Sequence, residues 1–265
     1  MSDDDFTLAG YSRLLGELQE RGYEARGFHD AEVDRRHVIL RHDVDMSLDA
    51  AVRMGEVERE LGVASIYFVL VRTELYNLFS AANERHLRQL LSDGHEIGLH
   101  FDAALYPESL EEIETACATE CSLLEEFLGE RVRTISFHRP AKRLVGLDRP
   151  LAGRRHAYEP RFVSEIGYCS DSRGAWRHGH PLDHPALAEG RALQLLTHPI
   201  WWDAHPGESP AQKLDRLAMR RFDTYRSELA YHCEPYRRAL KANFPILDSP
   251  TSDELRRSES EGKTQ

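Results

Sequence analysis

The sequence has no long hydrophobic run and no basic, apolar leader. No stretch of about 18 consecutive apolar residues occurs, so the sequence predicts no membrane-spanning helix. The first ten residues, MSDDDFTLAG, are acidic and lack the charged and then apolar order of a secretory signal. From these two absences we expect a cytoplasmic protein.

Basic residues are in the minority, with 34 Lys and Arg against 45 Asp and Glu, which gives a formal net charge of −11. A protein that grips phosphate groups over a broad surface needs an excess of positive charge. This charge balance argues against nucleic acid or an anionic membrane surface as the partner. We expect a small-molecule substrate instead.

Cysteine is also scarce. The four cysteines form no CxxC pair and lie far apart or at helical spacing, at positions 117, 121, 169 and 233. This pattern predicts buried thiols in a reducing compartment rather than disulfides or a zinc ribbon.

What is present is an alternation of short apolar runs and longer amphipathic segments. The runs predict strands at residues 37–41, 64–71, 95–100, 132–137, 166–170 and 192–197. The amphipathic segments predict helices at residues 11–19, 47–62, 83–91, 107–129 and 210–240. Repeated strand–helix–strand units indicate an α/β protein with a parallel sheet, open or closed into a barrel. We expect one domain over residues 1–250 and a polar, disordered tail over 251–265.

Polar side chains collect where these predicted strands end. They are His42, Asp43, Asp45, His100, Asp102, His138, Arg139, Asp171 and His198. The carboxyl ends of parallel strands share one face of the sheet, so these side chains are expected to converge there. Buried carboxylates repel each other unless a cation lies between them. A mixed set of histidine and aspartate therefore predicts one divalent metal ion, with zinc as the default.

Plainer explanations exist for each of these residues. Asp43 and Asp45 could cap the helix that follows them. His100 could be a hydrogen-bonded core residue, His198 could be structural, and Arg139 before a proline is typical of a surface turn. The functional interpretation rests on their occurring together at several strand ends.

Three tryptophans follow the last two predicted strands. Trp176 comes after the strand at 166–170, and Trp201 and Trp202 come after the strand at 192–197. Aromatic rings stack on sugars, which makes all three candidate substrate-binding residues. Tryptophan is also a common core residue, and the sequence does not separate the two roles.

At these residues the sequence resembles the polysaccharide deacetylase, or NodB-homology, superfamily (carbohydrate esterase family 4), in an outlying intracellular branch. The matching strings are LRHDVD at 40–45, SIYF at 65–68, GHEIGLH at 94–100, SFHRP at 136–140, YCSDSRGAW at 168–176 and LLTHP at 195–199. Each string is short, and their common order and spacing make the signal specific. Together they cover roughly residues 35–205.

The resemblance implies a distorted (β/α) barrel with fewer strands than a TIM barrel. It also implies a metal-dependent hydrolase that removes N-acyl or O-acyl groups, often from sugars. By position, Asp43 would be the general base, Asp45 and His100 metal ligands, and His198 the general acid. Asp171 and Trp176 would support His198.

Two positions depart from the pattern of that superfamily. A second histidine is expected four residues after His100, and Ala104 stands there. His138 is the favoured replacement ligand, and Asp102 is the alternative. The third motif usually carries an arginine that holds the catalytic carboxylate, and His138 occupies its place. Either Arg139 reaches Asp43 from the next position, which the proposed mechanism uses, or the site has been rearranged.

The function predicted from these residues is hydrolysis of an amide-linked acyl group on a sugar or glycan precursor. Alternatives are a metal phosphoesterase and a degenerate barrel that binds a sugar or metal without turnover. A basic segment could receive the nucleotide of a sugar-nucleotide substrate, through Lys142, Arg143, Arg149, Arg154 and Arg155.

Overall fold

The structure is a computed structural model that describes residues 6–106, 109–140, 142–177 and 179–241. The chain divides into two compact units, Met1–Lys213 and Leu214–Gln265, which are described separately. The predicted tail over 251–265 lies outside the described residues, and a single domain over 1–250 stays a prediction.

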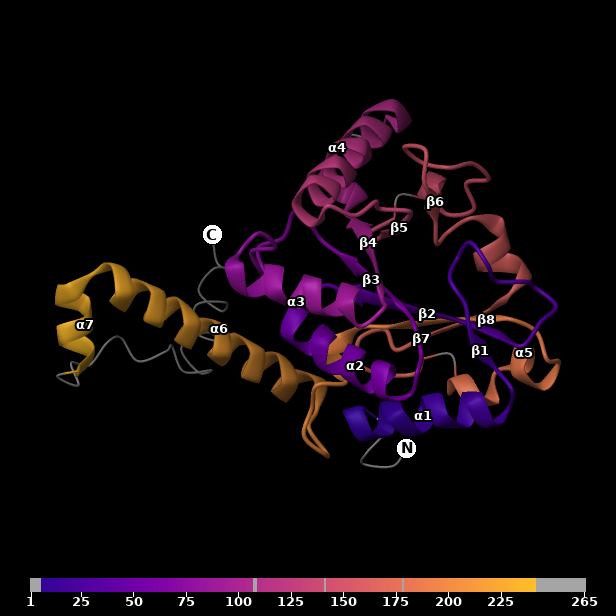
Figure 1. Cartoon of the computed structure of the whole chain (residues 1–265), viewed down its shortest axis with the longest axis horizontal. Helices are drawn as coiled ribbons and strands as arrows, with labels where there is room; N and C mark the ends of the chain where they lie inside the picture. The colour runs from indigo at the N-terminus through magenta and orange to yellow at the C-terminus, as the bar shows by residue number, and fades with distance from the viewer. Residues whose placement is uncertain (1–5, 107–108, 141, 178, 242–265) are drawn as a thin grey trace, which may run out of the picture. The chain divides into compact units, whose positions relative to one another are not determined.

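The first unit is built on a parallel sheet of eight strands (Figure 1). The strands are β1 (Glu24–Ala25), β2 (His37–Val44), β3 (Ile66–Val69), β4 (Glu96–Phe101), β5 (Thr134–Phe137), β6 (Arg155–His156), β7 (Gly167–Ser170) and β8 (Leu193–Thr197). Their order is β6-β5-β4-β3-β2-β8-β7, and β1 pairs with the start of β2. In the described part of the chain the outermost strands, β6 and β7, are not paired with each other. The sheet is thus a curled, incomplete barrel, which confirms the predicted parallel (β/α) architecture.

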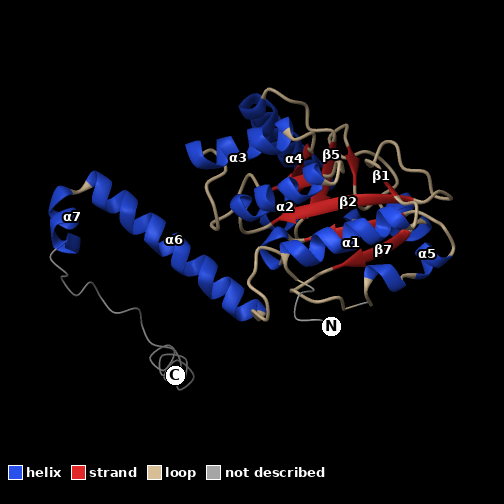
Figure 2. Cartoon of the chain, turned by 60° about the horizontal axis from the view of Figure 1, so that its bottom comes forward, coloured by secondary structure: helices blue, strands red, loops and turns tan. Residues whose placement is uncertain are grey.

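Helices connect the strands and cover the outside of the sheet (Figure 2). They are α1 (Leu8–Glu20), α2 (Leu48–Glu60), α3 (Ala81–Ser92), α4 (Leu110–Leu128) and α5 (Pro185–Ala188). Ser47 caps α2 by accepting a hydrogen bond from the backbone N–H of Ala50 at 3.2 Å, as the sequence predicted. Gly129 ends α4 at φ 73°, a left-handed conformation that glycine adopts at little cost. Ser47 thus marks the start of α2, and Gly129 marks the end of α4.

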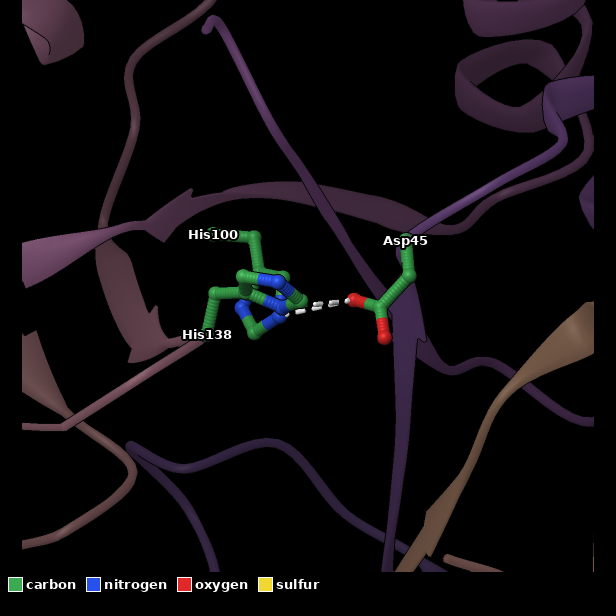
Figure 3. Close-up of side chains that lie close together, drawn as sticks. All are labelled: Asp45, His100 and His138. Atoms are coloured by element: carbon green, nitrogen blue, oxygen red, sulfur yellow. Dashed lines mark hydrogen bonds and ion pairs between the residues drawn. The ribbon is translucent and has the colours of Figure 1, made fainter. Parts of the chain in front are cut away.

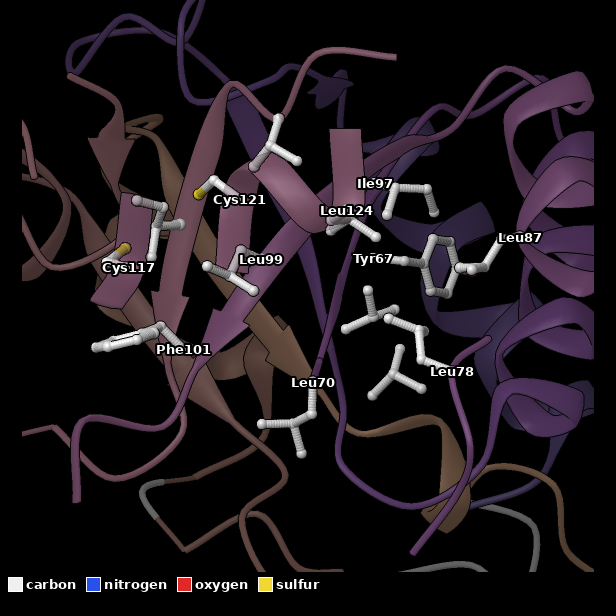
Figure 4. Packing of buried hydrophobic residues seen from close by; sticks show 14 of the residues in the cluster. Tyr67, Leu70, Leu78, Leu87, Ile97, Leu99, Phe101, Cys117, Cys121 and Leu124 are labelled. Atoms are coloured by element: carbon white, nitrogen blue, oxygen red, sulfur yellow. The ribbon is translucent and has the colours of Figure 1, made fainter. Parts of the chain in front are cut away.

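A large apolar cluster packs α3 and α4 onto β3, β4 and β5 (Figure 4). Leu87 of α3 and Leu124 of α4 are fully buried in it, and each such side chain contributes about 1.5–3 kcal/mol. Cys117 and Cys121 lie in the same cluster, as predicted. Cys233 is exposed, so the prediction that all four thiols are buried is wrong.

The second unit contains most of α6 (Pro210–His232) and α7 (Glu234–Lys241). The sequence predicted one helix here, and the structure has two, separated at Cys233. Pro235 explains the break, because it has no N–H to donate and its ring clashes with the carbonyl four residues earlier. No helix among the described residues is long and apolar enough to cross a membrane.

Candidate active site

The centre of the site is a buried ion pair on β2. Side chains alternate along a strand, so Arg41 and Asp43 point to the same face. Arg41 donates from Nε to Asp43 Oδ1 at 2.9 Å and from Nη2 to Oδ2 at 2.7 Å. Both side chains are almost fully buried, at 1% and 4% exposed. Burial opposes ionisation of Asp43, but Arg41 and His100 outweigh it and lower its pKa below the usual value.

Two of the three remaining donors of Arg41 are also occupied. Nη1 donates to Gln194 Oε1 and Nη2 to the hydroxyl of Tyr158, each at 3.2 Å. The guanidinium also lies over the Tyr158 ring, 4.9 Å from its centroid. Arg41 is therefore held in one position, and it fixes the orientation of the Asp43 carboxylate.

The sequence led us to expect that Arg139 would hold Asp43, and this is wrong. Arg139 donates from Nε to both carboxylate oxygens of Asp102, at 3.0 and 3.1 Å, and its side chain is 57% exposed. Asp102 also accepts from the backbone N–H of Ala104. The two-residue period of β2 was the signal that could have identified Arg41, because it places positions 41 and 43 on one face.

Three side chains form a group that fits a metal ion: Asp45, His100 and His138. Asp45 Oδ1 lies 3.0 Å from His100 Nε2 and 3.1 Å from His138 Nδ1. Figure 3 shows both imidazole rings turned toward the Asp45 carboxylate. His138 is thus part of this group, whereas Asp102 is engaged by Arg139.

The hydrogen bonds around His100 suit a metal ligand. Ser136 Oγ donates to Asp43 Oδ1 at 3.2 Å and lies 2.5 Å from His100 Nδ1. Since the serine proton is given to Asp43, its oxygen accepts from His100 Nδ1–H, which leaves the Nε2 lone pair free. Two imidazoles and one carboxylate around an open position are a donor set typical of catalytic zinc.

His198 follows β8 and is held by Asp171, which follows β7. Asp171 Oδ1 lies 2.6 Å from His198 Nδ1, and Oδ2 accepts from the backbone N–H of His198 at 2.9 Å. Burial disfavours the protonated form of His198, but the Asp171 carboxylate more than compensates and raises its pKa to about 9. Nε2 faces Asp45, 3.9 Å from Oδ2.

The three tryptophans have different positions. Trp202, not Trp176, supports Asp171, donating from Nε1 to Oδ2 at 2.8 Å, and it is only 1% exposed. Trp176 packs against Phe6 and Trp202. Only Trp201 lines the cavity at the site, which leaves it as the candidate for contact with a substrate.

The strand ends enclose a cavity of about 370 Å³. Its walls carry the groups described above together with aromatic and aliphatic side chains: Asp43, Asp45, Met46, His100, Phe137, His138, Tyr158, Tyr168, Ser172, Arg173, Leu196, His198, Ile200 and Trp201. Polar groups that converge beside aromatic and aliphatic side chains in a pocket of this size are typical of a small-molecule site.

His42 does not belong to this cavity, although it adjoins Asp43. It points to the helix side of the sheet, where Nε2 lies 2.7 Å from Glu58 Oε1 and Nδ1 lies 2.6 Å from Thr197 Oγ1. The hydroxyls of Tyr11 and Tyr67 donate to the same Glu58 carboxylate at 2.6 and 2.7 Å. A second polar network therefore lies behind the site, fully buried.

No protein-family model and no curated protein matches the sequence. Among solved structures, the chain is similar to a family 4 acetyl xylan esterase from Clostridium thermocellum in complex with cobalt, at 15% identity and a TM-score of 0.39 over 69% of this chain and 84% of the other. It is similar to the deacetylase PplD of Streptococcus pyogenes in complex with acetate, at 15% identity and a TM-score of 0.43 over 77% and 84%. It is also similar to a family 4 pseudoenzyme from Bacillus anthracis, at 14% identity and a TM-score of 0.38 over 71% and 63%.

Proposed function

We propose that this protein is a metal-dependent hydrolase that removes an acyl group from an amide on a sugar or glycan precursor. The observation that carries the proposal is the placement of a buried carboxylate, paired with Arg41, and a histidine, hydrogen-bonded to Asp171, around one metal-binding group. His100 Nε2 lies 3.7 Å from Asp43 Oδ2, and His198 Nε2 lies 3.9 Å from Asp45 Oδ2. The resemblance of the sequence strings to polysaccharide deacetylases supports the same chemistry.

Asp45, His100 and His138 would hold the divalent ion, with zinc the metal best matched to these donors. A metal ion bound there supplies a Lewis acid and lowers the pKa of a coordinated water toward 7. Ser136 orients His100 for this task, and the Asp45 carboxylate balances part of the positive charge.

Asp43 would be the general base. Arg41 keeps it ionised and fixes its position, so it can accept one proton as a water oxygen bonds to the carbonyl carbon. His198 would be the general acid, because Asp171 holds it protonated with Nε2 toward the cavity. As the carbon–nitrogen bond breaks, the proton of His198 passes to the departing amine, and the products are a carboxylic acid and an amine.

The two alternatives make different demands on the site. A phosphoesterase with two metal ions needs a second set of ligands, and within the described ranges Asp45, His100 and His138 are the one such group found. A barrel that only binds has no need of both a base and an acid. Asp43 and His198 therefore favour a catalyst.

The test is metal content and acetate release on the same samples. Purified protein reloaded with zinc is expected to hold about one equivalent, and His100→Ala and His138→Ala are expected to lose it. Against N-acetylglucosamine oligomers, Asp43→Asn is expected to reduce acetate release by about 10²–10⁴-fold while retaining zinc. Asp148→Asn, at an exposed position outside the cavity, is the matched control. Retention of zinc in both histidine variants, or undiminished turnover in Asp43→Asn, would contradict the proposal.

A further inference from the structure

Arg173 stands out among the residues that line the cavity. It lies in a turn directly after Asp171, closed by a hydrogen bond from Gly174 N–H to the Asp171 carbonyl at 2.9 Å. Its φ is 61°, in the left-handed region that side chains other than glycine adopt only with strain. A turn that had only to reverse the chain would be better served by glycine. The strained turn places the arginine side chain at the cavity, which makes Arg173 a candidate for a role there.

The charges around the cavity leave Arg173 uncompensated. Asp43 is paired with Arg41, and His198 is hydrogen-bonded to Asp171. Asp45 lies against His100 and His138. No described residue forms an ion pair or hydrogen bond with the side chain of Arg173, which is exposed and lines the cavity. The guanidinium of Arg173 is therefore a positive charge at the cavity without an anionic partner among the described residues.

The basic segment expected to bind a nucleotide does not supply this charge. Arg149 pairs with Glu114, Arg154 with Glu125 and Arg155 with Glu159. None of the five basic residues of that segment lines the cavity. If the substrate carries a negative group, the residue placed to meet it is Arg173.

We infer that Arg173 is a specificity-determining residue that binds a phosphate or carboxylate group carried by the acylated sugar. The planar guanidinium donates two parallel hydrogen bonds to such a group. Trp201 and Tyr168 also line the cavity, and aromatic rings stack on sugars. The inference rests on the proposed function only in taking the ligand to be an acylated sugar.

The test compares three N-acetylated sugars that differ in charge. N-acetylglucosamine is neutral, N-acetylglucosamine 1-phosphate carries a phosphate, and N-acetylmuramic acid carries a carboxylate. Their dissociation constants are measured by calorimetry on the zinc-loaded full chain and on Arg173→Gln. We expect one or both charged sugars to bind the wild-type protein at least about tenfold more tightly than the neutral one. Arg173→Gln is expected to abolish that preference.

Arg85→Gln, at an exposed position of α3 outside the cavity, is the matched control and is expected to keep the preference. Equal affinity for all three sugars in the wild-type protein, or a preference that survives in Arg173→Gln, would overturn the inference. Acetate release is measured separately. Charge-dependent binding without acetate release would overturn the proposed hydrolysis but not the role of Arg173. Acetate release without a charge preference would overturn the role of Arg173 but not the proposed hydrolysis.

The strain gives a second readout. Arg173→Gly removes the guanidinium and relieves the left-handed backbone, so we expect the melting temperature to rise by about 2–4 °C while the charge preference is lost. A fall in melting temperature would contradict the assignment of strain to this position. An Arg173→Gly variant that keeps the preference would contradict the role of the side chain.

Discussion

The ion pair of Arg41 and Asp43 is almost completely buried, which makes each residue dependent on the other. Removing one member of such a pair leaves the other charged and unpaired, at a cost of about 3–5 kcal/mol. Replacing both by apolar side chains avoids that cost. The same contact, between Arg41 and Asp43, therefore contributes both to the stability of the folded protein and to the ionisation of Asp43.

We therefore expect Arg41→Met to lower the free energy of unfolding by about 3–5 kcal/mol, and Arg41→Met/Asp43→Leu to recover most of the loss. Urea denaturation of the metal-free protein measures both, with Arg85→Met as the control for loss of an exposed arginine. If Arg41→Met is as stable as the wild-type protein, the ion pair does not contribute to the free energy of unfolding.

Ser136 links the base to the metal-binding group, because it donates to Asp43 and accepts from His100. Ser136→Ala removes the partner of His100 Nδ1 without touching the three ligands. We expect zinc affinity to fall by about 10–100-fold, as measured by competition with a chelating dye. Unchanged affinity in Ser136→Ala would argue against His100 as a ligand through Nε2.

At the scale of elements, α2 is tied to the sheet and to α1 through one carboxylate, Glu58. The groups that face it come from β2, α1, β3 and the segments before β3 and β4: His42, Tyr11, Tyr67, Ser65 and His95. Burial opposes ionisation of Glu58, but His42 and the other donors outweigh it and lower its pKa to about 2. The folded protein thus keeps Glu58 ionised at a pH where the unfolded chain is protonated.

This difference makes stability depend on pH in a defined window. A lowered pKa in the folded state stabilises the protein above the unfolded value, near 4.5, and the stabilisation is lost as the pH falls toward 2. The loss amounts to roughly 3 kcal/mol over that window. In Glu58→Gln we expect a flatter dependence of unfolding free energy on pH between 4.5 and 2, measured by urea denaturation at several pH values. Parallel curves for the two proteins would exclude Glu58 as the source.

The sequence was enough to predict which strand ends form the site, but only in part which side chains pair with one another there. The meeting of Asp45, His100 and His138 follows from parallel strands ending at one face. The two-residue period of β2 places Arg41 on the same face as Asp43, but the sequence does not show that Arg139, beyond the end of β5, turns toward Asp102 instead. Nor does it separate Trp201, at the cavity, from Trp202, behind it, since neighbouring residues in a turn face different ways.

At the scale of the whole molecule, every strand that the structure describes and every site residue lies in the first unit. Ending the chain after Arg221 keeps that unit and the start of α6 intact. We expect the shortened protein to bind zinc as the full chain does and to melt within about 3 °C of it, because a unit with its own core folds by itself. Loss of cooperative melting after this truncation would show that the first unit depends on the rest of the chain.

The strand β2 carries polar networks on both of its faces: Arg41 and Asp43 on one, His42 on the other. Hydrophobic alternation, which ordinarily selects the alignment of a strand, therefore discriminates poorly here. A slip by one residue would bury all three polar groups opposite the wrong neighbours, leaving charges unpaired on both sides at once. The penalty on every neighbouring alignment thus enforces the correct alignment of β2, and that alignment is the one that brings Asp43, paired with Arg41, to the cavity.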